Sequence, residues 1–371
     1  MKGEKIKADK IYHILYVVIM SVIVSLVVVL ILTASAEEKR PVKVGCILNG
    51  SMSEPGWNGA NYDGISAACK SAGLELSVRE NVPEEEMPCL SAASSLVSDG
   101  CEVIFLVSYG YEAYTEKLLS LHPDVRFCVT GSDTMDERLI YYLGRLYEGR
   151  YLAGLVAGCT TKSNVIGYVA AMPNNEINRG INAFTLGVRK VNPDAVVKVV
   201  FTGAWSSGGA EREAVEALKA ASADVIAYHQ DQESVPEACE ALGVDFIGCY
   251  EMVGVYSPHC LTSIECEWDK VYGNILRDIR NRKRLVKNIY WLGVSDGAVS
   301  LSDYSQNVSL RARYEVSFAT DDIKAGMNVF SGEIYDNKGM LRCAEGEAIG
   351  DKSLIFGMNW YIQGVERYEV K

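Results

Sequence analysis

A regular alternation of short apolar strands and longer helical stretches, which begins after residue 40, constrains the fold more than any other feature of the sequence. Near-continuous apolar strands separated by helices are typical of parallel sheets with helices on both faces. The alternation runs through two sets, so it predicts an α/β chain with two similar lobes. The strands of the first set are expected at Val42–Leu48, Leu74–Val78, Glu102–Ser108 and Val125–Thr130, with helices near 57–72, 84–98 and 110–121. Those of the second set are expected at Val165–Ala171, Val196–Thr202, Asp224–His229 and Asp245–Cys249, with helices near 175–191, 207–221 and 232–242.

The N-terminal segment has the features of an export signal. Residues 1–10 carry four Lys against two acidic residues, and we expect this n-region to stay in the cytoplasm. The uncharged segment 11–36 contains an apolar core, Ile14–Leu32, whose 19 residues are close to a bilayer span of about 20. Ala34-Ser35-Ala36 has the form of a signal cleavage site. Segment 11–36 is therefore a signal anchor or a cleaved signal peptide, and both place residues 37–371 outside the cytoplasm.

Each lobe is expected to draw on more than one part of the 335 residues from 37 to 371, a length that suits two domains. The first lobe is predicted at 41–162 and is expected to be completed by about 262–290. The second lobe is predicted at 163–261, with part of 291–371. In this last part the pattern favours strand and turn at Ile289–Ser302, a helix at Ala312–Met327 and a hairpin at Val329–Leu341.

The charge and the reactive residue types exclude several classes of function. The net charge of −12 argues against a nucleic acid partner, because phosphate binding needs a basic surface. The eleven Cys include no C-x-x-C pair and only four His are present, so neither a metal site nor a cofactor is predicted, and we expect mostly free buried thiols. No G-x-S-x-G elbow and no carboxylate pair at a catalytic spacing is found, so an enzyme is not expected.

Ligands of such α/β lobes bind at the carboxyl ends of the strands, in the loops that open the next helix. The loop after the first strand holds Glu54, Trp57 and Asn58. An indole face can stack on a planar ring and an amide can hydrogen-bond to its edge. The alternative for Trp57 is simple packing against the helix, and for Glu54 a solvated loop carboxylate. Tyr111 follows the third strand, in a second loop that we expect at the cleft.

The second set of strands offers a matching group of side chains. Trp205 follows its second strand and is expected to face Trp57 from the opposite lobe. His229 and Asp231 lie at the end of its third strand, where Asp231 serves as a helix N-cap, as a ligand contact, or as both. The candidate ligand contacts are Glu54, Trp57, Asn58, Tyr111, Trp205, His229, Asp231, Tyr250 and Glu251.

Long stretches of the sequence resemble one known family. The resemblance is most specific in GRLYEGRYLAGLVAG (144–158), in the runs 163–205 and 212–231, and in GMNWYIQGV (357–365). Over about residues 42–367 the chain resembles the basic membrane protein (BMP, or PnrA-like) family of solute-binding proteins of ABC transporters. The resemblance implies a type I periplasmic-binding-protein fold, in which two Rossmann-like α/β lobes meet at a hinge around a central ligand cleft.

The family implies a purine nucleoside or a purine base as ligand, imported through a membrane permease and an ATPase. Glu54, Trp57 and Asn58 match the family's first-loop motif, with Glu54 in the place of an Asp. The Trp form of this motif is similar to a branch associated with free purine bases. Trp205 and Asp231 match aromatic and acidic positions of that branch.

Two positions that the resemblance connects with ribose depart from the nucleoside-binding pattern. Tyr250-Glu251 stands where an Asp is expected, and Thr262-Ser263 is followed by no Lys until Lys270. We therefore expect a purine base or a similar flat heterocycle rather than a nucleoside.

The sequence thus predicts an extracytoplasmic substrate-binding protein of an ABC importer. It is expected at the extracytoplasmic face of a bacterial cell membrane, either N-terminally anchored or secreted after signal cleavage. We expect a monomer that binds its purine between two lobes, delivers it to ABC permease subunits and catalyses no reaction. The alternative is a membrane-tethered sensing module that reports ligand occupancy to a partner signalling protein.

Overall fold

The computed structural model describes residues 13, 15–27, 42–54, 56–130, 139–249, 257–281 and 289–370. The chain forms two compact units, Met1–Val42 and Lys43–Lys371. In the first unit, residues 15–27 are helical. The predicted n-region and much of the anchor-or-signal segment lie outside the described residues. Within the described parts, no helix combines the length and the apolar character that a membrane crossing requires.

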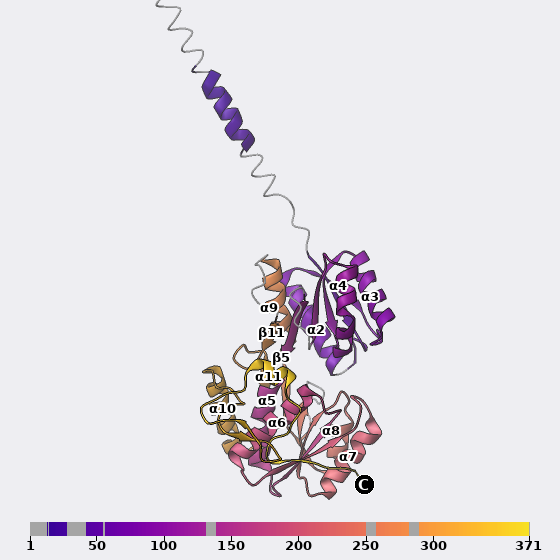
Figure 1. Ribbon diagram of the computed structural model, residues 1–371, viewed down its shortest axis with the longest axis vertical. Coiled ribbons are helices and arrows are strands. Elements are labelled where there is room, and N and C mark those ends of the chain that lie inside the picture. Colours follow the sequence, from indigo (N-terminus) through magenta and orange to yellow (C-terminus); the bar gives the residue numbers. More distant parts are fainter. Residues whose placement is uncertain are drawn as a thin grey trace, which may run out of the picture. The chain divides into compact units, whose positions relative to one another are not determined.

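The first lobe of the second unit is built on a parallel sheet of six strands in the order β11-β5-β4-β3-β1-β2 (Figure 1). Helices cover both faces of this sheet: α3 and α4 pack on one face through an apolar cluster, and α2 and α9 pack on the other. The strands are β1 (Lys43–Leu48), β2 (Glu75–Arg79), β3 (Cys101–Val107), β4 (Arg126–Thr130), β5 (Leu139–Gly144) and β11 (Ile289–Leu292). The helices are α2 (Trp57–Ala72), η1 (a 3₁₀ turn, Tyr109–Tyr114), α3 (Glu86–Ser98), α4 (Thr115–Leu121) and α9 (Trp268–Arg280).

The second lobe is built on a seven-stranded sheet in the order β12-β10-β9-β8-β6-β7-β15, parallel except for the edge strand β12. This arrangement confirms the α/β fold with two parallel sheets that the alternation of strands and helices predicts. The strands are β6 (Val165–Ala170), β7 (Val196–Phe201), β8 (Val225–His229), β9 (Asp245–Cys249), β10 (Cys260–Cys266), β12 (Val299–Leu301) and β15 (Val365–Arg367). The helices are α5 (Leu146–Thr160), α6 (Asn175–Val191), α7 (Gly208–Ala220), α8 (Ser234–Leu242) and α10 (Leu310–Lys324).

The chain passes between the two lobes three times, from β5 to α5, from β10 to α9 and from β11 to β12. The expected first lobe, 41–162, includes α5, but the structure places this helix against α6 and β10 of the second lobe. The boundary therefore lies near residue 145. It is hard to see in the sequence because a single residue separates β5 from α5.

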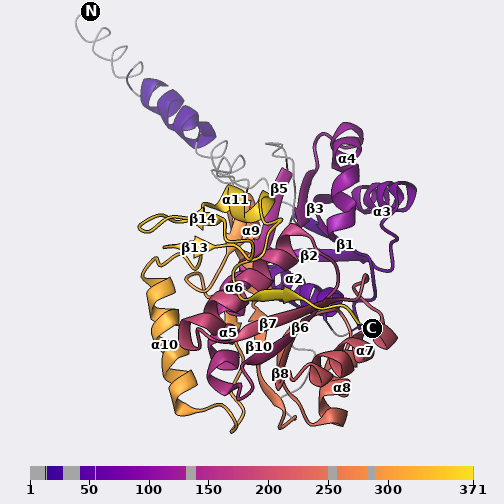
Figure 2. The same cartoon turned by 60° about the horizontal axis from the view of Figure 1, so that its bottom comes forward.

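The C-terminal residues wrap around the second lobe. The predicted hairpin is present as β13 (Ile334–Tyr335) and β14 (Leu341–Cys343), an antiparallel pair. It is followed by the short helix α11 (Asp351–Phe356), which Figures 1 and 2 both show beside β5 and α6. Buried Asn178 and Asn182 of α6 donate their side-chain amides to the carbonyls of Met358 and Trp360, at 2.8 and 2.9 Å. These bonds hold the segment after α11 on the surface of α6.

Helices α5 and α6 pack so closely that their backbones touch. A Cβ on Gly154 would lie 2.1 Å from the carbonyl oxygen of Phe184, and one on Gly187 would lie 2.0 Å from that of Tyr151. Both glycines are buried, and real Cβ atoms do not approach backbone oxygens so closely. Only glycine fits at these two positions, because any side chain would push the helices apart.

We expect Gly187→Ala to lower the free energy of unfolding by about 2–4 kcal/mol, because the added methyl group must displace backbone. The matched control is Gly273→Ala in the middle of α9, where a Cβ meets nothing within 4 Å. That change should raise stability by up to about 1 kcal/mol, since Ala favours the helix over Gly. Denaturant unfolding of the full chain under reducing conditions measures both, and equal effects would contradict the proposed backbone contact.

Candidate functional site

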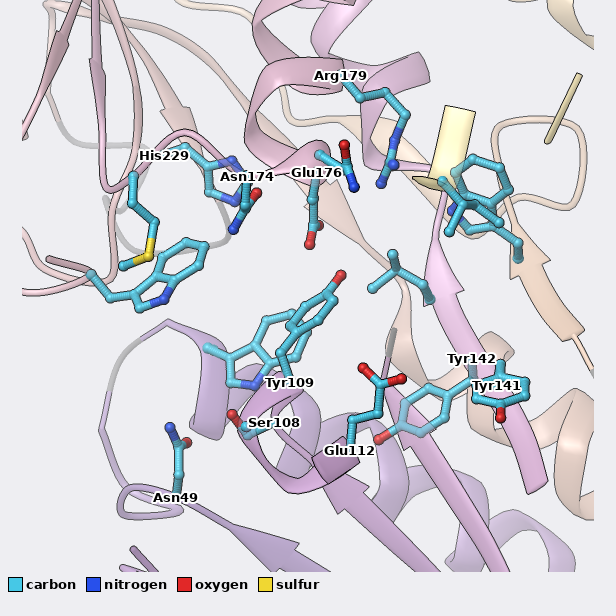
Figure 3. Close-up of a pocket in the computed structure, with 18 of the residues that line it drawn as sticks. Asn49, Ser108, Tyr109, Glu112, Tyr141, Tyr142, Asn174, Glu176, Arg179 and His229 are labelled. Carbon is cyan, nitrogen blue, oxygen red and sulfur yellow. The ribbon is translucent and has the colours of Figure 1, made fainter. Parts of the chain in front are cut away.

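A cavity of about 460 Å³ opens at the carboxyl ends of strands from both lobes (Figure 3). This is where ligands bind in open α/β folds. The first lobe contributes Asn49, Trp57, Glu84, Ser108, Tyr109, Gly110, Glu112, Tyr141, Tyr142, Leu143, Ile289, Tyr290 and Trp291. The second lobe and the C-terminal segment contribute Met172, Asn174, Asn175, Glu176, Arg179, Trp205, His229, Asp231, Ile355 and Phe356.

Trp57, the first residue of α2 and a ligand contact expected from the sequence, lines the cavity. Its indole N–H donates to the carbonyl of Val107 at the end of β3, at 3.0 Å. The ring also packs edge to face with Trp268, with centroids 5.3 Å apart. Because its only polar atom is already bonded, Trp57 offers a ligand an aromatic surface rather than a hydrogen bond.

Trp205 and Asp231 line the cavity from the second lobe, and His229 lies with them. The backbone N–H of Asp231 donates to the carbonyl of Trp205 at 2.9 Å, so the loops after β7 and β8 are tied together. The Trp205 ring packs against the imidazole of His229, with centroids 5.6 Å apart. Trp57 and Trp205 thus line this cavity from opposite lobes.

Two titratable groups at the second-lobe wall have shifted pKa values. Burial, with the positive charges of Arg150 and Arg179, lowers the pKa of His229 well below 6.5, so its imidazole is neutral at pH 7. Burial, with the negative charges of Glu54, Glu211 and Glu176, raises the pKa of Asp231 to about 7. A neutral imidazole and a half-ionised carboxyl can each donate or accept a hydrogen bond at physiological pH.

The start of helix α6 lines the cavity, and the sequence analysis does not single out its residues. The helix begins after Asn174, whose side-chain oxygen accepts the N–H of Ile177 at 2.9 Å. Glu176 in the first turn points at the hydroxyl of Tyr109 from the first lobe (Figure 3). Burial and the Glu176 carboxylate raise the pKa of Tyr109 well above 10. The indicator in the sequence is position, since Tyr109 comes two residues after β3 and Glu176 lies in the first turn of the helix that follows β6.

The cavity is negatively charged. Its described lining includes four carboxylates, on Glu84, Glu112, Glu176 and Asp231, against the single guanidinium of Arg179. The Glu84 carboxylate accepts the hydroxyl of Ser108 at the first-lobe wall. An excess of acidic over basic side chains repels anions in a confined space of low dielectric constant. The site therefore favours neutral or cationic ligands over phosphorylated ones.

Three predicted contacts that the structure describes, Glu54, Asn58 and Tyr111, do not line the cavity. The Glu54 carboxylate accepts a hydrogen bond from the amide nitrogen of Asn58 at 2.6 Å, and the amide oxygen of Asn58 is buried without a hydrogen-bond partner among the described residues. Tyr111 is fully buried in the apolar cluster under α3 and α4, and its hydroxyl donates to Val82 at 2.6 Å. The 3₁₀ turn η1 causes this, since it directs Tyr111 inward and leaves Tyr109 at the cavity. Tyr250 and Glu251 lie outside the described residues.

Comparison with known families gives one match that spans most of the chain. The model of the Bmp family, described as PnrA-like ABC transporter substrate-binding proteins, matches residues 41–329. The chain belongs to this family. PnrA-like proteins are substrate-binding components of ABC transporters rather than enzymes, and they act outside the cytoplasm.

Two relatives of this PnrA-like protein have names that point to different ligands. A purine-binding protein of Brucella abortus is 31% identical over 338 residues, which cover 90% of this chain and 95% of the relative. A protein of Haloferax volcanii, provisionally named as an ABC transporter glucose-binding protein, is 34% identical over 71% of this chain and 65% of its own length. Identity alone therefore does not decide the ligand of this chain.

Solved structures share the fold. A solute-binding protein of an ABC transporter system from Conexibacter woesei has a TM-score of 0.62, with 19% identity, and covers 77% of this chain and 97% of its own. A transcriptional activator from Bacillus halodurans has a TM-score of 0.69, with 21% identity, and covers 76% and 98%. These likenesses confirm the type I binding-protein architecture.

The raised pKa of Asp231 predicts a stability cost that depends on pH. Between pH 3.8 and about 7 the folded protein holds a proton on Asp231 that the unfolded chain has released, so this group's contribution to stability falls as pH rises through that window. Asp231→Asn removes the charge. The free energy of unfolding of this variant should exceed that of the wild type by little below pH 4. The difference should grow up to pH 7, to at most about 4 kcal/mol.

Thermal unfolding of the ligand-free protein between pH 4 and pH 8 measures this gain as the difference from the wild type at each pH. The control is Asp303→Asn, at an exposed loop carboxyl, which should show no growing gain. A gain for Asp231→Asn that stays constant with pH would refute the buried-carboxyl explanation.

Proposed function

We propose that this chain is the extracytoplasmic receptor of an ABC importer for a purine-type ligand, with a free base favoured over a nucleoside. The observation that carries the proposal is the pair of indoles, Trp57 and Trp205, that line one cavity from opposite lobes. Two aromatic surfaces facing one space suit a flat heterocycle, which gains affinity by burial of both faces. His229 and Asp231 beside them supply donors and acceptors for its edge.

The preference for a base over a nucleoside rests on the hydrogen bonds made by residues at the positions that the family resemblance connects with ribose. Lys270, the first Lys after Thr262-Ser263, donates its ammonium group to the carbonyl of Gly297 at 2.7 Å and does not line the cavity. Thr262 and Ser263 hydrogen-bond to Ser302 next to β12. None of these three residues lines the cavity and each bonds to a residue outside it, which supports a ligand that lacks ribose.

The mechanism follows from the lobes and their three connections. Binding of the ligand to both walls would draw the lobes together by rotation at the crossings, as in other hinged binding proteins. Closure would bring the first-lobe loop with Glu54 and Asn58 toward the second-lobe wall. The closed form would then dock on the permease. The neighbouring carboxylates would discourage nucleotides, whose phosphates carry the same sign of charge.

The test is thermal unfolding of the full chain in detergent, under reducing conditions, against adenine, hypoxanthine, guanine, adenosine, inosine, AMP and glucose. A ligand that binds only the folded state at 100 times its dissociation constant stabilises it by about 2.7 kcal/mol. For a chain of this size that corresponds to a shift of a few degrees. We expect shifts with free bases, smaller shifts with nucleosides and none with AMP.

Trp205→Ala should abolish the shift with free bases. The control, Trp360→Ala, removes an indole that lies outside the cavity beside Arg342, and it should lower the melting temperature without removing the ligand-induced shift. A shift with nucleosides alone would contradict the preference for bases. A shift with glucose alone would overturn the purine assignment.

A further inference from the structure

We propose that the cavity contains a second region that receives an apolar substituent carried by the purine ligand. This region, called here the hinge-side subsite, is formed by Leu143 of β5, Ile289 and Trp291 of β11, and Ile355 and Phe356 of α11. The inference rests on the proposed function, since it names which purines the same cavity should prefer.

The two parts of the cavity are built from different elements. The indole pair, His229 and Asp231 lie at the ends of the inner strands, whereas the hinge-side subsite lies at the sheet edge formed by β5 and β11. In Figure 3, Tyr109 and Glu176 lie between His229 on one side and Tyr141 and Tyr142 of β5 on the other. The total volume of about 460 Å³ falls in the range of sites for drug-sized molecules, so it has room for more than a bare bicyclic ring.

The lining of the hinge-side subsite is apolar. Its residues carry a single polar side-chain atom, the indole nitrogen of Trp291, and that N–H donates to the carbonyl of Gly144 at 3.2 Å. The guanidinium groups of Arg145 and Arg179 lie 4.3 and 5.0 Å from the centroid of the Trp291 ring, so the ring is held by cation–π contacts. A substituent entering here meets hydrocarbon surface on these five side chains, with the Arg179 guanidinium as the polar neighbour, and this lining favours alkyl and aryl groups over a sugar.

The wall made by α11 is fixed in place. Arg145 makes two bonds to the carboxylate of Asp351, at 2.8 and 2.6 Å, and its Nε donates to the carbonyl of Trp291 at 2.9 Å. Arg179 donates to the carbonyl of Leu354 at 2.8 Å. Arg145 thus holds the first residue of α11 against β11, and Arg179 holds the fourth residue of α11 against α6. Because this wall is fixed before the ligand binds, less conformational entropy is lost on binding.

The two helix residues of the hinge-side subsite come from near the C-terminal end of the sequence. Helix α11 spans Asp351–Phe356 and lies beyond residues 41–329, the part that the family model matches. The indole pair lies inside the matched part. Leu143, Ile289 and Trp291 also lie inside the matched part, so only Ile355 and Phe356 of the hinge-side subsite come from outside it.

The test compares adenine with N6-benzyladenine by calorimetric titration of the full chain in detergent. If the phenyl group is buried in the hinge-side subsite, N6-benzyladenine should bind at least about tenfold more tightly than adenine, with a more negative heat-capacity change. Adenosine, whose substituent is a sugar, should show no such gain.

Variants locate the gain. Phe356→Ala should bring the ratio of the two affinities close to one, and Ile355→Trp, which fills the subsite, should reverse the preference. The control is Phe318→Ala on the exposed face of α10, at a side chain that is 67% exposed and far along the chain from α11, and it should keep the wild-type ratio. Adenine binding without a gain for the benzyl compound would overturn the subsite and leave the proposed function standing. A gain that survives both subsite variants would overturn its location, and failure of every purine to bind would overturn both proposals.

Discussion

The direct backbone contact between α5 and α6 sets the position of most of the cavity. Helix α5 continues from β5 of the first lobe after one residue, so its direction is tied to the edge of that sheet. Helix α6 lies against it at the spacing that Gly154 and Gly187 allow, and its first turn carries Glu176 and Arg179 into the cavity. A wider spacing of these helices would move the second-lobe wall away from the first lobe. The site thus depends on two residues that touch no ligand.

Burying titratable groups in the cavity lowers the stability of the ligand-free protein. Burial keeps the His229 imidazole neutral and holds a proton on Asp231 to a higher pH than water would allow. Groups with perturbed pKa values gather where a protein gives up stability for recognition. The arginines of the same region act differently, because the guanidinium groups of Arg145 and Arg179 contact aromatic rings, backbone carbonyls and one carboxylate. The carboxylates therefore dominate the field that a ligand meets.

How far the sequence predicts the molecule depends on whether a feature has a local cause. Strands bounded by turn residues are found from the sequence, and so is the position of Trp57, because it ends the loop that connects such a strand to the next helix. The strand Leu139–Gly144 escapes notice because no turn residue separates it from α5. The sequence favours Tyr111 over Tyr109 since nothing in it reveals the inward turn of η1. The wall of α11 comes from contacts between segments about 200 residues apart, which no local pattern encodes.

The three crossings between lobes also determine the order in which the protein can be completed as it leaves the ribosome or an export channel. Helix α2 packs against α9, with Gly64 seated on the backbone of Trp268, and β5 pairs with β11, so the first lobe stays unfinished until those later segments emerge. By then most of the second lobe has already been synthesised. Contacts between segments so distant in the chain form late, because the entropy of closing the loop opposes them. Until α9 and β11 form, α2 therefore covers its face of the first-lobe sheet without its partner helix, and the edge of β5 lacks the strand that pairs with it.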